Sequence, residues 1–343
     1  MRRAIQLAKN GLGTTYPNPM VGCVIVYQEK IIGEGYTSPY GGSHAEVNAI
    51  AMVKDTSVLK EATLYVTLEP CSHFGKTPPC ADLIIKHQVS NVIIGLLDPH
   101  EKVAGHGIQK LKDAGCTVTV GVLENECRKH HKRFLTYHQK KRPYITLKWA
   151  ATKDSFIAPE KKSRKLKPEP YWITNSYSRQ LVHQWRAEEQ AILVGTNTVL
   201  ADNPKLDIRQ WKGKNPLRVL LDKSLKIQGD YHVLDQSTPT LILTQSKETT
   251  KYIQGIQYEV IDYSKSLAKQ VCEVLFKHHI NSIIIEGGAQ TLETFISEDL
   301  WDEARIFTGN SFFQKGTKAP AFSGRLIRSQ KIEHDLLNYY TND

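Results

Sequence analysis

The sequence predicts an α/β fold divided into two domains, and three observations predict it. Short runs of β-branched and apolar residues alternate with segments of helical periodicity along the chain. A length of 343 residues is enough for two domains of ordinary size. The basic segment Lys140-Lys141-Arg142-Pro143 interrupts the pattern, so we expect one domain over residues 1–141 and another over 144–343.

The composition is that of an ordinary globular protein, with 40% hydrophobic and 23% charged residues. The net charge of +10 suits anionic partners such as phosphorylated small molecules, and a lysine-rich composition explains it equally well. No apolar run reaches the length of a membrane span, and no signal peptide is visible. Six cysteines without a secreted-protein pattern fit the reducing cytoplasm. A helical pattern is already under way at Met1, so we expect the natural chain to begin earlier.

The first domain is expected to be a short helix, a hairpin and then alternating helices and strands. The expected elements are a helix over 2–10, paired strands over 21–27 and 30–36, a helix over 44–54, a strand over 62–68, a helix over 78–87, a strand over 91–97, a helix over 107–114, a strand over 117–122 and a helix over 124–138. Gly11 ends the first helix, and Ser43 is the expected N-cap of the second. This alternation predicts parallel strands.

The second domain repeats the α/β pattern after the linker. Strands are expected over 144–152, 191–195, 218–222, 240–244 and 282–285, with helices over 178–190, 265–277 and 291–296 and a charged loop over 160–170. Glu286-Gly287-Gly288 lies between a strand and a helix start, where small residues let the backbone approach a phosphate. A plain tight turn is the commoner interpretation, and the GxGxxG fingerprint is absent.

One imidazole and two thiols are spaced as ligands of a catalytic zinc ion. His44 is followed by Glu46, and Cys71 and Cys80 lie in the segment TLEPCSHFGKTPPC. Zinc takes imidazole and thiolate in tetrahedral geometry, and a catalytic site leaves the fourth position to water. Glu46 is then a carboxylate that is not a ligand and can carry a proton to the substrate. His-x-Glu followed by Pro-Cys…Cys is the signature of zinc-dependent nucleobase deaminases, which commonly have two residues between the cysteines where this chain has eight.

Two other interpretations of these residues stay open. A structural zinc site needs a fourth protein ligand, for which His73 is the nearest candidate, and a disulfide between Cys71 and Cys80 is the second alternative. The free carboxylate of Glu46 favours the catalytic site. Residues two apart on a helix point about 200° apart, so His44 and Glu46 share a site only if the end of their helix faces it. A helix start at Cys80 would also favour its thiolate.

Four segments of the first domain resemble the deaminase half of the bifunctional deaminase/reductases of riboflavin biosynthesis, the RibD family. They are PNPMVGCVIV at 17–26, HAEV at 44–47, TLEPCSHFGKTPPC at 67–80 and DPHEKVAGHGI at 98–108. The resemblance implies a cytidine-deaminase-like α/β/α layer with Zn²⁺ on His44, Cys71 and Cys80. It also implies that Asn18 orients the pyrimidine ring, with a turn residue between two prolines as the alternative. His73 and Lys76 would contact the phosphate or sugar of the substrate.

The chain after residue 144 resembles the reductase half of the same family, with weaker motifs. This resemblance implies a dihydrofolate-reductase-like α/β domain with NADPH as its cofactor. The implied cofactor contacts are Ala150, Trp172, Thr198, Asp202 and Gly288. The implied substrate contacts are Arg186, Leu206, Arg209 and Glu286. The two arginines suit a ribose phosphate because a guanidinium binds phosphate with paired hydrogen bonds.

Three positions depart from the family pattern: Ser155 stands where relatives have glycine, and Pro170 and Lys223 stand where they have serine. A monofunctional deaminase with a degenerate reductase domain is therefore an alternative. A deaminase acting on nucleic acid is a second, although the cysteine spacing and the lack of interleaved aromatic and basic residues argue against it. A zinc-stabilised binding module is a third, and it would have no need of Glu46.

The resemblance implies two consecutive reactions. The first is zinc-dependent hydrolytic deamination of 2,5-diamino-6-(5-phosphoribosylamino)pyrimidin-4-one, and the second is NADPH-dependent reduction of the ribosyl group to ribityl. The expected partners are phosphorylated pyrimidine small molecules, with no nucleic acid and no membrane. We expect a cytoplasmic homo-oligomer.

Overall fold

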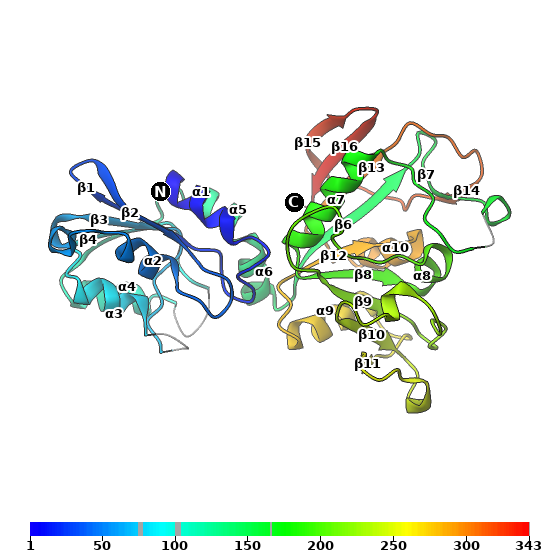
Figure 1. The fold of residues 1–343 in the computed structure, drawn as a ribbon, viewed down its shortest axis with the longest axis horizontal. Coiled ribbons are helices and arrows are strands. Elements are labelled where there is room, and N and C mark those ends of the chain that lie inside the picture. The colour runs from blue at the N-terminus through cyan, green and yellow to red at the C-terminus, as the bar shows by residue number, and fades with distance from the viewer. Residues whose placement is uncertain (75–77, 100–103, 165–166, 343) are drawn as a thin grey trace. The chain divides into compact units, whose positions relative to one another are not determined.

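The chain forms two compact units, Met1–Lys141 and Arg142–Asp343 (Figure 1). The structure, a computed structural model, describes residues 1–74, 78–99, 104–164 and 167–342. Each unit is built on a sheet with helices packed against it, so the α/β fold class predicted from the sequence is confirmed in both. Among the described residues, no helix has both the length and the hydropathy that a membrane span needs.

The first unit is built on a five-stranded sheet with the order β2-β1-β3-β4-β5. Its strands are β1 (Gly22–Tyr27), β2 (Lys30–Tyr36), β3 (Thr63–Val66), β4 (Asn91–Ile94) and β5 (Thr117–Val120), and its helices are α1 (Arg2–Ala8), α2 (Ala45–Ala51), α3 (Cys80–Lys86), α4 (His106–Asp113), α5 (Glu124–His130) and α6 (Lys132–Lys140). The predicted hairpin of β1 and β2 is confirmed. Parallel pairing holds for β3, β4 and β5. It is wrong for the pair of β1 and β3, which run antiparallel.

Two helices of the first unit differ from the sequence expectation. Ser43 is not the N-cap of α2, because His44 holds that position with extended backbone (φ −73°, ψ 164°) and the helix begins at Ala45. The helix expected over 124–138 is divided into α5 and α6 at His131. The His131 ring is buried, and its Nε2 lies 3.1 Å from Thr67 Oγ1. Because α2 begins at Ala45, His44 is the residue directly before this helix.

Two glycines of β2 fix the position of α2. A Cβ atom at Gly35 would lie 2.3 Å from the Ala45 carbonyl oxygen, and one at Gly33 would lie 2.3 Å from the Ala49 carbonyl oxygen. Only glycine permits so close an approach of a helix backbone to a strand. The apolar side of α2 continues this contact into the core of the unit, where Ala45, Ala49 and Ile50 are buried. Packing against the sheet therefore determines where the helix start, and with it His44, lies.

The second unit is built on a nine-stranded sheet with the order β11-β10-β9-β8-β12-β6-β13-β16-β15. The strands of the unit are β6 (Tyr144–Ala151), β7 (Phe156–Pro159), β8 (Ala191–Gly195), β9 (Leu217–Leu221), β10 (Thr240–Thr244), β11 (Gln257–Val260), β12 (Ser282–Glu286), β13 (Glu303–Thr308), β14 (Gly316–Lys318), β15 (Arg325–Ile332) and β16 (Asp335–Thr341). Of these, β7 and β14 lie outside the nine-stranded sheet and pair with each other as a separate two-stranded sheet. The helices are α7 (Ser176–Glu188), α8 (Thr196–Asp202), α9 (Leu267–Lys277) and α10 (Ala289–Ser297). The strands from β11 to β13 in this order are parallel, and β16 and β15 extend the sheet as an antiparallel hairpin.

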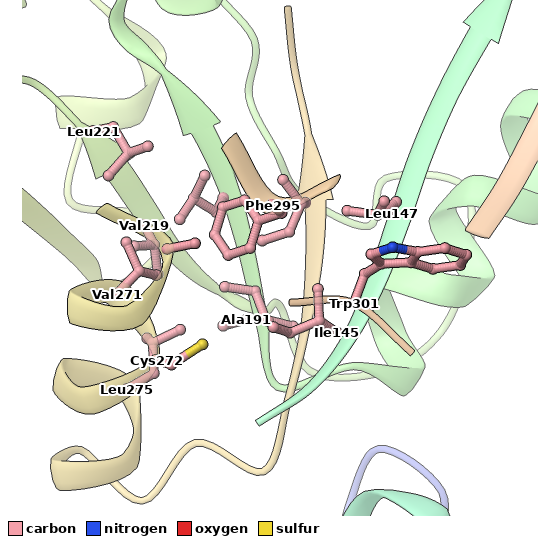
Figure 2. Close-up of a cluster of buried hydrophobic side chains, with 14 of the residues drawn as sticks. Ile145, Leu147, Ala191, Val219, Leu221, Val271, Cys272, Leu275, Phe295 and Trp301 are labelled. Carbon is pink, nitrogen blue, oxygen red and sulfur yellow. The ribbon is translucent and has the colours of Figure 1, made fainter. Parts of the chain in front are cut away.

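Apolar residues cover both faces of this sheet, because successive side chains of a strand point to opposite sides. On one face, side chains of the sheet pack against α9 and α10, and Figure 2 shows Phe295 among residues of this cluster. On the other face, Val182 and Trp185 of α7 and Val199 of α8 close a second cluster. The sheet is thus buried between two helical layers, and its carboxyl-end loops are the part left for ligands.

Six strands of the second unit were not expected from the sequence. They are β7, β11, β13, β14, β15 and β16. Charged residues interrupt the apolar pattern of β13, where Glu303 and Arg305 are buried and pair at 2.6 Å. β15 is largely exposed and carries few apolar residues. Neither pattern has the apolar run by which a buried strand is identified from sequence.

Ser155 occupies the left-handed region with φ +66°. This conformation costs an ordinary residue about 1 kcal/mol more than glycine. We therefore expect Ser155→Gly to stabilise the second unit by about 1 kcal/mol and to raise its Tm by roughly 2–4 °C, as measured by calorimetry. Ser155→Ala is the matched control, because it removes the hydroxyl and keeps the strained conformation. An equal rise in both variants would contradict this explanation.

Candidate active sites

Three ligand-type atoms converge at one end of the first sheet. His44 stands before α2, Cys71 follows β3, and Cys80 is the first residue of α3. The Nδ1 atom of His44 lies 3.3 Å from Cys80 Sγ and 3.6 Å from Cys71 Sγ, and all three atoms lie within 4.8 Å of one another. The Cys80 backbone N–H also points at Cys71 Sγ, 3.3 Å away. The predicted meeting of two helix starts at a strand end is confirmed.

The donor set fits zinc in both chemistry and spacing. Zinc–sulfur bonds of ~2.3 Å and zinc–nitrogen bonds of ~2.0–2.1 Å at tetrahedral angles put sulfur and nitrogen roughly 3.6 Å apart, close to the distances found here. The two thiols also need a cation. The Cys80 thiol and His44 hydrogen-bond to the Cys71 sulfur and lower the pKa of Cys71 to about 4, while the same hydrogen bond to Cys71, together with burial, raises the pKa of Cys80. A divalent ion removes this conflict by holding both as thiolates.

Glu46 lies beside this cluster in the first turn of α2 and is 3% exposed. Burial, together with the nearby Cys71 thiolate, raises the pKa of Glu46 to about 7. His44 and Glu46 both interact with the cysteines, so the end of the helix faces the site, as the 200° argument required. A fourth protein ligand is not part of the group that the described residues form. Glu46 is therefore a carboxylic acid that lies beside the three ligand residues and does not belong to the ligand set.

Two of the three expected substrate contacts of the first unit, Asn18 and His73, belong to the described residues and lie outside its helices and strands. Asn18 is half-buried in a turn, where its N–H donates to the Thr15 carbonyl at 2.9 Å. This turn is tied to the segment that leads to His44, because the Tyr40 N–H donates to the Thr14 carbonyl. His73 is exposed two residues after Cys71. Lys76 lies outside the described residues.

Glu69 was not singled out in the sequence, yet it organises the loops beside the metal ligands. Its buried carboxylate accepts four backbone N–H groups, from Asp98 (3.2 Å) and Gly105 (3.0 Å) on one oxygen and from Gly107 (2.9 Å) and Ile108 (3.2 Å) on the other. It thus joins the loop after β4 and the start of α4 to the strand end that carries Cys71. An acidic residue directly after a buried strand, two positions before a ligand, was the available signal.

The second unit brings two glycine turns together at the carboxyl ends of neighbouring strands. Gly195 is the last residue of β8, and Gly287 and Gly288 follow β12. A Cβ atom at Gly195 would lie 2.6 Å from Thr291 Oγ1, and Gly287 has φ +146°. The Gly288 N–H donates to Thr198 Oγ1 at 3.0 Å, so two of the expected cofactor contacts lie side by side. Close backbone at a helix start fits the pyrophosphate of a dinucleotide.

A buried group of three charges lies next to these turns. Glu286 Oε2 accepts from Arg186 Nη2 at 3.0 Å, and Lys148 Nζ lies 3.5 Å from Glu286 Oε1. Burial acts to raise the pKa of Glu286, but Arg186 and Lys148 outweigh it, and the pKa is lowered. Burial lowers the pKa of Lys148. Arg186 and Glu286 were expected as substrate contacts. Lys148 was missed, although a lysine inside the apolar strand 144–151 was a visible signal.

The remaining expected contacts of the second unit have varied surroundings. Asp202 ends α8 and accepts from Arg164 Nη2 at 2.5 Å, while burial raises its pKa. Trp172 is 57% exposed, and its ring lies under the Arg179 guanidinium. Leu206 is 2% exposed and packs into the core, so its backbone rather than its side chain is available to a ligand. Ala150 is half-buried on β6, and Arg209 pairs with Asp207.

Comparison with known proteins agrees with both halves of this description. Residues 1–96 match the cytidine and deoxycytidylate deaminase zinc-binding region, and residues 143–338 match the RibD C-terminal domain. The riboflavin biosynthesis protein RibD of Aquifex aeolicus is 39% identical over 97% of this chain and 94% of that protein. RibD of Escherichia coli is 35% identical over 90% of this chain and 86% of that protein.

Solved structures give the same result. The diaminohydroxyphosphoribosylaminopyrimidine deaminase/5-amino-6-(5-phosphoribosylamino)uracil reductase of Thermotoga maritima has a TM-score of 0.90 and 36% identity, covering 99% of this chain and 97% of that one. A RibD structure from Acinetobacter baumannii has a TM-score of 0.89 and 32% identity, with the same coverage.

The fold and the two sites define a two-domain enzyme in which a zinc-dependent deaminase is joined to an NADPH-dependent reductase. The chain belongs to the RibD family of riboflavin biosynthesis proteins. The first unit is accordingly called the deaminase domain below, and the second unit the reductase domain.

Replacement of Glu69 tests its role in the deaminase domain. Glu69→Gln puts an amide NH₂ where a carboxylate oxygen accepts two backbone N–H groups. We expect it to lower the free energy of unfolding by about 1–3 kcal/mol in urea titrations, because buried donors lose their acceptor. Glu29→Gln at an exposed turn makes the same chemical change and is expected to stay within about 0.5 kcal/mol. Equal effects of the two variants would show that the four hydrogen bonds contribute nothing.

Proposed function

We propose that this chain carries out two consecutive steps on one phosphorylated pyrimidine. The deaminase domain hydrolyses the amino group of 2,5-diamino-6-(5-phosphoribosylamino)pyrimidin-4-one, and the reductase domain converts the product, 5-amino-6-(5-phosphoribosylamino)uracil, to its ribityl form. The Thermotoga maritima relative, named for both activities, supports this assignment of substrates. The observation that carries the proposal is the convergence of His44, Cys71 and Cys80 within 4.8 Å beside a carboxylate.

In the deaminase domain, His44, Cys71 and Cys80 hold the metal and Glu46 moves protons. Zinc, when bound, supplies Lewis acidity and a water whose pKa is lowered toward 7. Glu46 accepts a proton from the water that attacks the amino-bearing carbon, and it returns this proton to the departing nitrogen. Water adds, the carbon–nitrogen bond breaks, and ammonia leaves. Asn18 orients the ring, while His73 and Lys76 contact the phosphate or sugar.

In the reductase domain, the residues beyond the parallel strand ends bind both ligands. Ala150, Trp172, Thr198, Asp202 and Gly288 contact NADPH, which supplies the hydride. Gly288 and Thr198 support its pyrophosphate through the glycine turn. Arg186 and Glu286 hold the substrate, the backbone at Leu206 lines the site, and Arg209 binds the ribose phosphate. Burial of the Lys148–Glu286–Arg186 group excludes water from the side of the sugar where hydride arrives.

Three further properties belong to the same proposal. The substrate is a free nucleotide-like molecule rather than nucleic acid, which the eight-residue spacing of the cysteines supports. The enzyme works in the cytoplasm, which its six free cysteines support. It assembles as a homo-oligomer, and the edge strand β15, where Leu326 and Ile327 are 51% and 55% exposed, is compatible with a self-contact.

The role of Glu46 is tested by Glu46→Gln. We expect the variant to keep one zinc per chain and to release ammonia from the diamino substrate about 10²–10⁴-fold more slowly, because Gln cannot transfer the proton. Metal content and ammonia release are the two measurements. Glu126→Gln on the exposed side of α5 is the matched control and should retain full activity.

Undiminished turnover by the zinc-loaded Glu46→Gln protein would refute the assignment and favour a binding module. Equal turnover of the wild-type chain with its metal removed would refute a catalytic metal. Both outcomes are read in the same ammonia assay.

The reductase activity is tested with the same variant. Glu46→Gln should consume NADPH when given 5-amino-6-(5-phosphoribosylamino)uracil and should consume almost none when given the diamino compound. The wild-type chain should consume NADPH with either. NADPH absorbance is the measurement. No consumption of NADPH by either protein, with the fold intact by circular dichroism, would leave a monofunctional deaminase.

A further inference from the structure

The turn of residues 206–209 contacts α7 through the backbone carbonyl of Asp207. The Asp207 carbonyl accepts from His183 Nδ1 at 2.8 Å and from Arg186 Nη1 at 3.1 Å. The two donors are three residues apart and share one face of the helix. Leu206 anchors the turn in the core, and the Ile208 N–H donates to Asn215 Oδ1 at 3.0 Å. The turn is therefore held on both sides before any ligand arrives.

The docking brings two guanidiniums and one imidazole together, and each guanidinium has one carboxylate partner. Burial and the charges of Arg186 and Arg209 lower the pKa of His183 to about 4, so this imidazole is neutral and both guanidiniums lie near it. Arg186 forms an ion pair with Glu286. Arg209 pairs with the Asp207 carboxylate and keeps 42% of its side chain exposed. Among the described residues, the Arg186 Nε atom is buried without a hydrogen-bond partner. The cluster thus has donor capacity that its own carboxylates leave unused.

We propose that the carboxylate of Asp207 sets the affinity of the reductase domain for phosphorylated ligands by occupying Arg209 until a phosphate displaces it. This inference rests on the proposed function, in which Arg209 binds the ribose phosphate. A carboxylate and a phosphate present similar paired oxygens to a guanidinium, so the two compete for the same donors. A dianionic phosphate outweighs a single carboxylate, and the competition lowers affinity without abolishing it.

Asp207 therefore has two separable roles. Its carbonyl positions His183 and Arg186, and this contact belongs to the backbone. Its carboxylate competes for Arg209, and this contact belongs to the side chain. Asp207→Asn removes the competing charge and preserves the carbonyl, so the variant isolates the second role.

The test measures binding of ribose 5-phosphate to the full chain by calorimetry. We expect Asp207→Asn to lower the Kd roughly two- to fivefold, which is the range of an exposed ion pair. Binding of unphosphorylated ribose should not change. Asp230→Asn, an exposed residue of the same domain, makes the same change in net charge and is the matched control. In a chain that also carries Arg209→Ala, Asp207→Asn should have no effect, because the competition acts through that guanidinium.

The outcomes separate the inference from the proposed function. If Arg209→Ala weakens ribose 5-phosphate binding but Asp207→Asn leaves it unchanged or weaker, the competition is overturned and the phosphate clamp stands. Equal tightening by Asp207→Asn and Asp230→Asn would show a general charge effect and would also overturn it. If Arg209→Ala has no effect on binding, the assignment of Arg209 to the phosphate fails, and the inference fails with it.

Discussion

The geometry of the deaminase domain depends on one electrostatic constraint: two thiols and an imidazole share a space too small for their charges without a cation. The local structure around each ligand residue brings the three groups into this space. Gly33 and Gly35 let α2 lie against β2, which places His44 at the helix start. Cys71 lies five residues after the end of β3, and α3 begins at Cys80. Because each ligand sits at an element end, the backbone rather than a flexible side chain sets the ligand spacing, and this rigidity is what a metal site requires.

The reductase domain also contains a group of charged side chains that are close together and largely buried. Lys148, Arg186 and Glu286 come from two strands and a helix and meet where β12 ends beside the middle of β6. Burying three charges costs more than their attraction returns unless each keeps its partner. The group is therefore weak evidence for stability, and its place beside the glycine turns indicates a role in binding. The deaminase domain brings its charged groups together as ligands for an ion, whereas the reductase domain pairs its charged groups with one another.

Most of the deaminase site could be predicted because its residues are close in sequence to diagnostic neighbours. The ligands, the free carboxylate and the helix ends all follow from short motifs. Glu69 could not be predicted in the same way, since its four partners lie 29 to 39 residues away and are backbone groups without side-chain identity. The hairpin of β1 and β2 was predicted, but the antiparallel pairing of β1 with β3 was not, because alternating helices and strands favour parallel pairing.

The reductase domain was harder to predict for a physical reason. Its site is assembled from residues far apart in the chain, so no local motif carries it. Asp207 and Arg209 lie in an irregular turn, and their significance depends on α7, which is 21 residues earlier at Arg186. The strands β13 to β16 carry buried ion pairs or exposed polar residues, which local patterns assign to loops. The buried strands β8, β9, β10 and β12 were predicted because burial on both faces makes them uniformly apolar.

The anchoring of Asp98 and Gly105 to one oxygen of Glu69 has a consequence for how this enzyme can change. A loop whose two ends are fixed to the same acceptor closes independently of what lies between them. Insertions and deletions there cost little closure entropy and leave the neighbouring metal ligands in place. The number of residues between Asp98 and Gly105 can therefore change during evolution without displacing Cys71, which lies two residues after Glu69.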